Sequence, residues 1–282
     1  MVSITVQLNF DYALSFRFFL LWQPLVETGA RSQLHHYTEH LEQEVYRRTQ
    51  ALEATNKELE TFVCSVSHDL REPLRAIQAY NQILLQEHST QLEAEGHVCV
   101  QRIAYNADRM SLLIQGLLAY SRLGRIELSL QAVDLSQLIQ EVLNQLELEL
   151  QEQQTQVIVD TLLPTVKAHR ATLFQVLMNL LTNAIKFVAP GVRPHIRIRA
   201  EPIKQSVRLW IEDNGIGIDP KHHAQIFQVF ERLHSLEKYP GTGIGLAIVQ
   251  KGTEKMGGRV GLESDLGQGS RFWLELPKID PT

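Results

Sequence analysis

One histidine in this chain stands where an imidazole could act as a nucleophile. His68 lies in the run Cys-Ser-Val-Ser-His-Asp-Leu-Arg-Glu-Pro-Leu, residues 64–74. On an ideal helix His68 falls about 200° from the apolar direction set by Val66, so the ring is predicted to face away from a helical core. A neutral imidazole keeps one ring nitrogen free to attack. Asp69 could accept a hydrogen bond from the other nitrogen and stabilise the imidazolium as it forms.

A second set of polar side chains shares one face of a predicted helix. Gln175, Asn179, Asn183 and Lys186 fall within about 40° of one line, and leucine and isoleucine residues surround that line. Burying amides and an ammonium in such a helix costs free energy unless they meet partners. A magnesium-bound triphosphate would supply partners, because Mg²⁺ prefers oxygen ligands. The alternative is a polar helix face that is open to water.

Two glycine-rich turns follow. Asp213-Asn-Gly215-Ile-Gly217 comes after a predicted strand, and a carboxylate there could accept from the exocyclic amine of adenine, although a simple turn has the same composition. The run Gly-Thr-Gly-Ile-Gly at residues 241–245 precedes a predicted helix, whose free amides could hold phosphate. Its spacing fits neither a Walker loop nor a Rossmann fingerprint.

The composition excludes several other kinds of site. The chain has 282 residues, 44% of them hydrophobic, and a formal net charge of −5. No basic excess points to a nucleic-acid partner. Cys64 and Cys99 are the only cysteines, too few for a disulfide framework and wrongly spaced for zinc. A reducing, cytoplasmic compartment is therefore expected.

Residues 1–33 are predicted to form a short apolar segment without an evident role. Asp11 and Arg17 interrupt it, and Pro24 is expected to end it. The longest uncharged stretch, residues 18–26, is far shorter than the ~20 residues that a bilayer span needs. No basic leader or cleavage site indicates a signal peptide. We expect a packing or interfacial segment, which leaves peripheral membrane association open.

A long helix with a coiled-coil seam is predicted from Leu34 to about Glu87. Apolar residues recur at spacings of seven, three and four along it: Leu34, Leu41, Val45, Leu52, Leu59, Phe62 and Val66. A polar stretch up to Gly96 should break this helix, and a second apolar helix then continues to Gly124. Two antiparallel helices with open apolar faces predict a dimeric four-helix bundle, with residues 34–125 as entry coil and hairpin.

Residues 126–282 are predicted to form an α/β sandwich with a mixed sheet. Asp134 is expected to cap a helix that reaches about Gln151, and residues 171–188 and 245–256 are predicted to be helical. The expected strands cover residues 156–160, 195–201, 206–211, 259–264 and 270–276.

The order of these blocks resembles the sensor histidine kinases of two-component signalling, in the phytochrome-like subclass, over about residues 35–280. The family combines a dimerisation and phosphoacceptor hairpin with a Bergerat-fold ATP-binding domain. By this resemblance His68 accepts the phosphoryl group, Asp69 acts as its base, Asn183 is the Mg²⁺ ligand, Lys186 contacts phosphate and Asp213 binds the adenine amine. The other nucleotide contacts that the resemblance implies are Asn179, Gly215, Gly217, Phe227, Phe230, Gly241, Thr242, Gly243, Gly245 and Leu246.

The long polar segment between Ile218 and Gly241 resembles the ATP lid of that family, with Phe227 and Phe230 as its aromatic box. The alternative is a packed surface loop, although loops of this length are usually functional. Three histidines of this segment, His222, His223 and His234, are interpreted as surface residues and not metal ligands, because no cysteine or carboxylate cluster completes a site.

The resemblance implies ATP- and Mg²⁺-dependent autophosphorylation on His68, followed by transfer to an aspartate of a response regulator in trans. The expected partners are a second copy of the chain, that regulator and, for input, a separate sensor protein; a truncated chain is the other explanation for the short N-terminal segment. Two alternatives are a GHKL-type ATPase and a catalytically inactive dimeric scaffold. Glu72 stands where many relatives carry threonine or asparagine, which puts phosphatase activity in doubt.

Overall fold

The structure is a computed structural model that describes residues 3–125, 128–233, 239 and 241–279, with the side chains of residues 3–35, 53, 56, 60 and 125 left aside. The chain divides into two compact units, residues 1–59 and 60–282. Among the described residues, no helix combines the length and the hydropathy that a bilayer span requires. The predicted start of the α/β domain at residues 126–127 and the predicted surface residue His234 lie outside the described residues.

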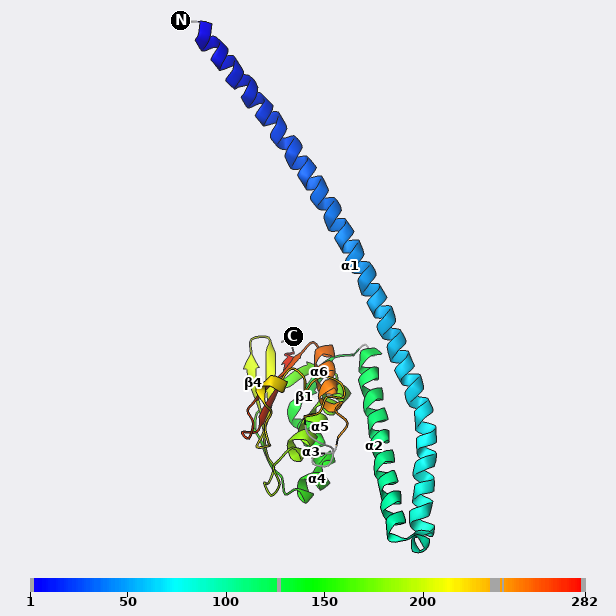
Figure 1. The fold of residues 1–282 in the computed structure, drawn as a ribbon. Coiled ribbons are helices and arrows are strands. Elements are labelled where there is room, and N and C mark those ends of the chain that lie inside the picture. The colour runs from blue at the N-terminus through cyan, green and yellow to red at the C-terminus, as the bar shows by residue number, and fades with distance from the viewer. Residues whose placement is uncertain (1–2, 126–127, 234–238, 240, 280–282) are drawn as a thin grey trace. The chain divides into compact units, whose positions relative to one another are not determined.

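The first unit is helical. It belongs to α1, which runs from Ser3 to Glu87 (Figure 1) and so begins far ahead of the predicted start at Leu34. Pro24 does not end this helix. The seam residues Leu41, Val45 and Leu52 are exposed, as they should be if a second chain is needed to cover a coiled-coil seam.

The second unit opens with a helical hairpin. The last part of α1 is followed by a 3₁₀ turn, η1 (Ser89–Gln91), and then by α2 (Ala94–Arg125). The polar stretch after Glu87 breaks the helix as predicted, although α2 starts before Gly96. Gln78 donates to the Asp108 carboxylate at 2.8 Å, and Cys64 Sγ lies 3.7 Å from Ser121 Oγ. These two contacts set the antiparallel register and place His68 level with Leu117 and Leu118.

The face of α1 that packs against α2 is not the apolar stripe that the sequence suggested. Buried residues recur at sevens along α1, as Ser67, Leu74 and Asn81, and they lie about 60–100° away from Val66 on the helix. The apolar stripe itself stays between 37% and 46% exposed at Val66, Leu70, Ile77 and Leu84. One chain therefore buries one seam of the hairpin and leaves the second, more apolar seam open.

The rest of the second unit is an α/β domain built on a mixed sheet (Figure 1). Five strands are ordered β2-β4-β5-β7-β6, where only β2 and β4 run parallel. Their bounds are β2 Gln156–Val159, β4 His195–Ile203, β5 Ser206–Asp213, β6 Arg259–Ser264 and β7 Ser270–Pro277. The prediction of a long helical hairpin followed by an α/β domain with a mixed sheet is confirmed.

A second, two-stranded sheet was missed by the sequence reasoning. β1 (Gln131–Asp134) pairs antiparallel with β3 (Thr165–Ala168), and the pairing brings together segments more than thirty residues apart. Asp134 ends β1 and caps the next helix, accepting from the amides of Ser136 and Gln137 at 2.8 and 3.2 Å. The cap prediction is correct, but Leu146 divides the expected single helix into two.

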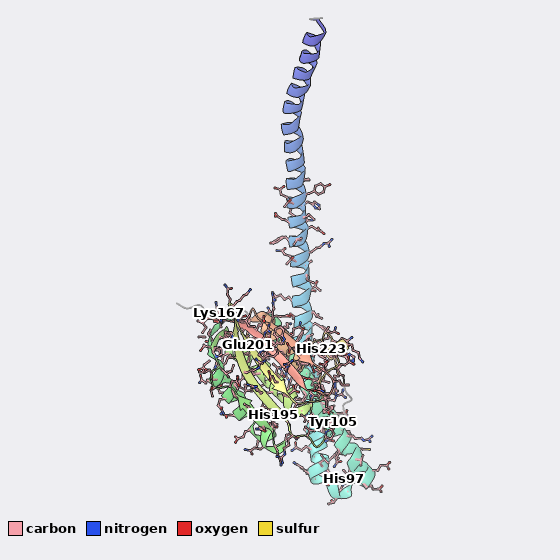
Figure 2. All side chains as sticks on the ribbon, turned by 90° about the vertical axis from the view of Figure 1, so that its left-hand side faces the viewer. His97, Tyr105, Lys167, His195, Glu201 and His223 are labelled. Atoms are coloured by element: carbon pink, nitrogen blue, oxygen red, sulfur yellow. The ribbon has the colours of Figure 1, made fainter. Side chains whose placement is uncertain are left out.

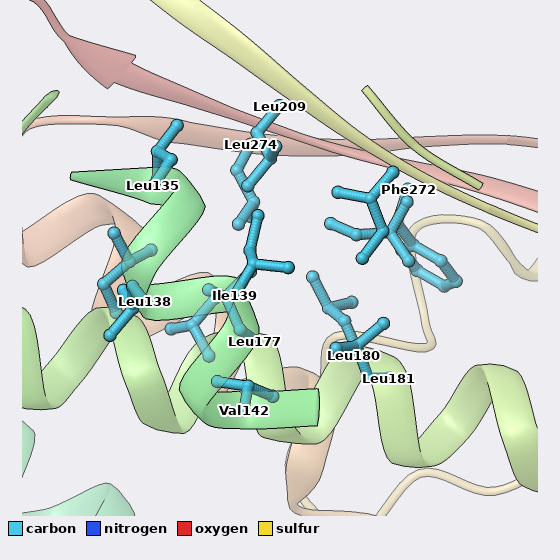
Figure 3. Close-up of a cluster of buried hydrophobic side chains, with 14 of the residues drawn as sticks. Leu135, Leu138, Ile139, Val142, Leu177, Leu180, Leu181, Leu209, Phe272 and Leu274 are labelled. Atoms are coloured by element: carbon cyan, nitrogen blue, oxygen red, sulfur yellow. The ribbon is translucent and has the colours of Figure 1, made fainter. Parts of the chain in front are cut away.

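Helices α3, α5 and α6 lie on one side of the five-stranded sheet (Figure 1). The helices of this domain are α3 Leu135–Gln145, α4 Glu147–Glu152, α5 Arg170–Lys186 and α6 Gly245–Lys255. Leucine and isoleucine side chains of α3 and α5 meet the inward-facing residues of β5 and β7, including Leu209, Phe272 and Leu274 (Figure 3). This core holds α5 rigidly, so the polar face of α5 keeps a fixed place relative to the ends of the strands.

The other face of the sheet carries stacked cations and indoles. The Arg199 guanidinium lies 4.8 Å from the Trp210 ring, and Arg208 lies 4.6 Å from the Trp273 ring. Arg199 also pairs with Glu212, and Arg208 pairs with Glu275. These side chains cover a sheet face on which no helix of the described residues packs, and the two ion pairs neutralise their charges locally.

Candidate functional site

His68 is presented on the outside of the hairpin. Its side chain is 79% exposed and that of Asp69 is 75% exposed, in line with the helical-wheel prediction. Nδ1 of His68 lies 3.2 Å from Oδ1 of Asp69, a contact that the spacing alone left open. With the proton on Nδ1, the imidazole donates to the carboxylate and Nε2 keeps its lone pair for solvent or substrate.

The polar stripe of α5 is only partly satisfied by the protein. Asn179, Asn183 and Lys186 are half-buried, whereas Gln175 is exposed. Nδ2 of Asn179 is buried without a hydrogen-bond partner, although a buried amide donor normally has one. Burial, followed by repulsion from Arg232, lowers the pKa of Lys186 to about 8. A buried donor without an acceptor and a crowded ammonium both favour an anionic, oxygen-rich ligand.

Asp213 lies at the carboxyl end of β5, beside the end of α5. Its Oδ1 accepts from the amides of Gly215 and Ser270 at 2.8 and 3.1 Å. Burial raises the pKa of Asp213 to about 6, against the lowering effect of these two donors. The turn is tied to α5, because Ile216 N donates to the Phe187 carbonyl at 2.8 Å. Among the described residues no donor contacts Oδ2, which is therefore the atom that could accept from an amine.

Gly217 shows why this turn needs glycine. Its φ is +68°, and a Cβ atom there would lie 1.9 Å from the Asp265 carbonyl oxygen. Both the left-handed backbone and the close approach exclude a side chain. Substitution would push the turn away from the strand ends and move Asp213 with it.

The glycine loop runs directly past the stripe of α5 and leads into α6. A Cβ atom on Gly241 would lie 2.9 Å from Lys186 Nζ, and one on Gly245 would lie 3.3 Å from Asn179 Oδ1. Gly243 has φ +73° and would meet the Glu231 carbonyl oxygen at 2.8 Å. Thr242 Oγ1 accepts weakly from Ile244 N at 3.4 Å, and Leu246 packs on the domain core. Backbone amides and the start of α6 thus face the polar stripe.

The two phenylalanines of the predicted aromatic box lie in different environments. Phe227 packs against the domain core, while Phe230 is 54% exposed. Phe230 has φ +69°, a left-handed conformation that is uncommon for a residue with a side chain. Its amide donates to the Gly243 carbonyl at 3.0 Å. This part of the segment therefore touches the glycine loop through its backbone.

The other histidines make local contacts. His222 Nδ1 lies 2.9 Å from Gln225 Oε1, and His223 Nε2 lies 3.2 Å from the Ile218 carbonyl. Figure 2 shows His223 and His195 on the α/β domain and His97 near the closed end of the hairpin. Within the described ranges, no three histidine, cysteine or acidic side chains gather as metal ligands would.

The α/β domain also contacts α2 through the start of α6. Ile244 and Ile248 form an apolar cluster with Leu123, and Leu117 and Tyr120 pack against it. A Cβ atom on Gly116 would lie 3.1 Å from Ile244 Cδ1. Lys251 Nζ lies 4.2 Å from the centre of the Tyr120 ring, and Lys255 donates to the Gly124 carbonyl at 3.0 Å. Ile244, which lies between two glycines of the loop, thus also packs against α2.

Sequence reasoning missed three residues near these groups. Ser270 donates to Asp213 from a strand 57 residues away, and no local signal marks it. Arg232 and Tyr239 lie in the segment before the glycine loop and contact each other, Arg232 Nη2 donating to the Tyr239 carbonyl at 2.9 Å. An aromatic residue immediately before Pro-Gly-Thr-Gly was the one available hint for Tyr239.

Comparison with known proteins matches two domains in this chain. The His Kinase A (phospho-acceptor) domain matches residues 58–126. The histidine kinase-, DNA gyrase B- and HSP90-like ATPase domain matches residues 168–280. His68 lies in the first domain, and the α5 stripe, Asp213 and the glycine loop lie in the second. The predicted ATP-binding domain is confirmed at the level of the domain family.

The relatives match most of this chain over only part of their own length. Cyanobacterial phytochrome B of Nostoc sp. is 37% identical over 232 residues, 81% of this chain and 30% of the phytochrome. Phytochrome-like protein Cph1 of Synechocystis sp. is 33% identical over 235 residues, 83% of this chain and 31% of that protein. The crystal structure of full-length ShkA in complex with AMPPNP has a TM-score of 0.61 and 32% sequence identity, and the match covers 78% of this chain and 46% of that one.

A phospho-acceptor hairpin joined to an ATPase domain of this type defines a class of signalling protein with its acceptor residue and its nucleotide site in one chain. This chain belongs to the sensor histidine kinases of two-component systems. It spans about a third of the length of the two phytochrome relatives.

Proposed function

We propose that this chain is an ATP-dependent protein-histidine kinase that phosphorylates His68 and passes the phosphoryl group to an aspartate of a response regulator. The observation that carries the proposal is a solvent-facing imidazole, already in contact with a carboxylate, combined with a downstream polar site. In that site Nδ2 of Asn179 is buried without a partner, and the Lys186 ammonium forms no ion pair with any described carboxylate. A nucleoside triphosphate would supply anionic partners for the polar site, and its terminal phosphorus would be the electrophile for His68.

The nucleotide occupies the space bounded by α5, the Asp213 turn and the glycine loop in this proposal. Asp213 accepts from the adenine amine, and Gly215 and Gly217 let the turn lie against the base. The loop amides and Lys186 hold phosphate oxygens. Asn183 is the proposed Mg²⁺ ligand, with Asn179 beside it on the same face; both offer the oxygen donors that this ion prefers. Bound Mg²⁺ would supply charge neutralisation at the phosphates.

In the proposed phosphoryl transfer, His68 is the nucleophile and nearby side chains stabilise the charges that develop. Nε2 of His68 attacks the terminal phosphorus in line, a new N–P bond forms and the bond to the ADP oxygen breaks. The positive charge that develops on the imidazole is held by Asp69, which accepts from Nδ1. Lys186 and the loop amides stabilise the charge on the leaving group. Positioning and electrostatics, without covalent chemistry by other residues, are what this reaction requires.

The phosphoryl group is acid-labile and base-stable on histidine, which gives a direct test. Incubation with γ-labelled ATP should label the wild-type protein and leave His68→Gln unlabelled. His88→Gln, an exposed histidine of the same hairpin that contacts Gln91, is the matched control and should label normally. Equal label on His68→Gln would disprove the assignment. ATP hydrolysis without labelled protein would favour a GHKL-type ATPase, and no nucleotide turnover at all would favour a dimeric scaffold.

A second copy of the chain is part of the proposal. The open seam of α1 and the exposed coiled-coil seam both require a partner of the same pattern, and pairing two hairpins through them gives a four-helix bundle. The response regulator is the acceptor in trans. A separate sensor protein, or a region upstream in a longer chain, supplies the input.

A further inference from the structure

Tyr239 is buried at a place where a loop residue would usually be exposed. It lies two residues before Gly241, and its side chain is only 5% exposed. Its ring packs on Phe187 with centroids 5.2 Å apart and planes at 42°. Its hydroxyl donates to the Val188 carbonyl at 3.0 Å. Tyr239 therefore fastens the end of the segment before the glycine loop to the carboxyl end of α5.

The backbone of the same residue holds a cation. The Tyr239 carbonyl accepts from Arg232 Nη2 at 2.9 Å. Arg232 also lies against the glycine loop, since a Cβ atom on Gly243 would be 3.1 Å from Arg232 Cγ. The guanidinium is thus fixed between the loop and the end of α5, and both of its anchors lie at the proposed phosphate site.

Arg232 is brought close to a second cation. Lys186 Nζ lies 4.1 Å from the centre of the Phe187 ring, the ring on which Tyr239 stacks. Repulsion from Arg232 contributes to the lowered pKa of Lys186, after burial. Within the described part of the chain, no carboxylate forms an ion pair with either cation. Two neighbouring cations are unfavourable alone and become favourable when a polyanion lies between them.

We propose that Tyr239 is a positioning residue for phosphoryl transfer, which acts by holding the Arg232 guanidinium beside Lys186 so that both cations meet the terminal phosphates of the bound nucleotide. This inference rests on the proposed kinase function. The stacked ring and the backbone carbonyl carry the effect, and the hydroxyl is an additional tether to α5. Fixed donors of this kind stabilise transition-state charge more than flexible ones, because they need no reorganisation during the reaction.

The test is a double-mutant cycle on autophosphorylation in the full chain. Tyr239→Leu should lower the rate at saturating ATP about tenfold, with the KM for ATP changed less than the rate. Arg232→Gln should lower it at least as much. If Tyr239 acts through Arg232, the double variant Tyr239→Leu/Arg232→Gln should autophosphorylate less than about twofold more slowly than Arg232→Gln alone. The positioning role would be overturned if the rate losses of the two single variants multiplied in the double variant. It would also be overturned if Tyr239→Leu changed only the KM for ATP.

Three further variants separate the contributions. Tyr239→Phe keeps the ring and the backbone carbonyl, so this variant should retain at least about half of the wild-type autophosphorylation rate. Arg232→Lys keeps the charge but loses the forked donor, and should still lower the rate about fivefold or more, which covers the case in which Tyr239→Leu does not fold. Arg197→Lys, in an exposed pair with Asp160, is the matched control and should leave the rate unchanged. A wild-type rate for Arg232→Lys would disprove the inference, whereas a wild-type protein that never labels would disprove the proposed kinase function itself.

Discussion

At the scale of single residues, environment gives similar side chains different tasks. Asp69 is exposed and contacts an imidazole, so it is placed to accept a hydrogen bond from that ring. Asp213 is held in a crowded turn, where burial raises the pKa of its carboxyl to about 6. Lys186 is affected in the opposite direction, and the pKa of its ammonium falls to about 8. An arriving adenine amine and phosphate would each favour the charged form that burial penalises.

Asp213 predicts a pH dependence of nucleotide binding. Below about pH 6 the carboxyl of the free protein is protonated, and it must release that proton to accept from the adenine amine. The dissociation constant for ATP should therefore rise as pH falls, by up to about tenfold per pH unit below 6. Asp213→Asn should bind more weakly at neutral pH and lack this additional rise. Calorimetric titrations of both proteins at about pH 5.5 and 7.5 compare the two.

The comparison between the two proteins removes the nucleotide's own titration. Phosphate groups of ATP change protonation in the same range, and they do so equally for wild type and for Asp213→Asn. Only the difference in slope belongs to the carboxyl. Parallel slopes in the two proteins would show that Asp213 does not accept from the base.

At the scale of elements, α6 serves two surfaces at once. Its first residues complete the glycine loop, while Ile244 and Ile248 dock on α2. Ile244 is flanked by Gly243 and Gly245, so a shift of the dock would be felt by the loop that we propose to bind phosphate. His68, level with Leu117 on the neighbouring helix, is exposed, and its ring contacts Asp69 on its own helix. The observed dock therefore fixes the position of the domain along the hairpin through residues of α2 and α6, and His68 is not among them.

Gly116 provides a direct test of this dock. Gly116→Leu should overpack against Ile244 and weaken the contact by about 1–3 kcal/mol. Hydrogen exchange should accelerate in residues 113–123 of α2 and at the start of α6, and remain unchanged in β5. Gly96→Leu is the matched control, because a Cβ atom there meets only Leu92 at an ordinary 3.5 Å. Unchanged exchange in Gly116→Leu would mean that the contact is not maintained in solution.

At the scale of the whole molecule, one chain leaves much apolar surface without cover. The intrachain seam uses small and polar residues, Ser67 and Asn81, around Leu74. The larger aliphatic residues stay on the second seam. A monomer would expose that seam to water, and two hairpins packed through it would bury it.

Charge placed in the open seam should therefore separate two chains. Ile77→Lys is expected to shift the protein from dimer to monomer, with a loss of about 2–3 kcal/mol or more per buried lysine. Sedimentation equilibrium measures the change. Ala79→Lys, exposed on the face that His68 shares, is the matched control and should remain dimeric. A dimeric Ile77→Lys protein would place the interface elsewhere.

Local pattern accounts for much of this protein. Heptad spacing indicated the long helix and the hairpin, period-two alternation indicated the strands of the main sheet, and Asp134 marked the start of α3. These features depend on neighbours within a turn or two, so the sequence carries them directly. The order of the motifs along the chain, which needs no three-dimensional information, indicated the family. The pairing of β1 with β3, the division at Leu146 and the start of α1 at Ser3 were not indicated, because long-range contacts or weak local signals decide them.

The sequence by itself determined which residue types could do chemistry: an imidazole next to a carboxylate, an amide stripe, and glycines at two turns. Tertiary structure decided which of these groups lack partners and which residues support them. Ser270 reaches Asp213 across neighbouring strands, and Tyr239 places Arg232 beside Lys186 across the end of α5. The physical reason is that burial, hydrogen-bond satisfaction and charge proximity are properties of three-dimensional surroundings, which residues distant in the chain create together.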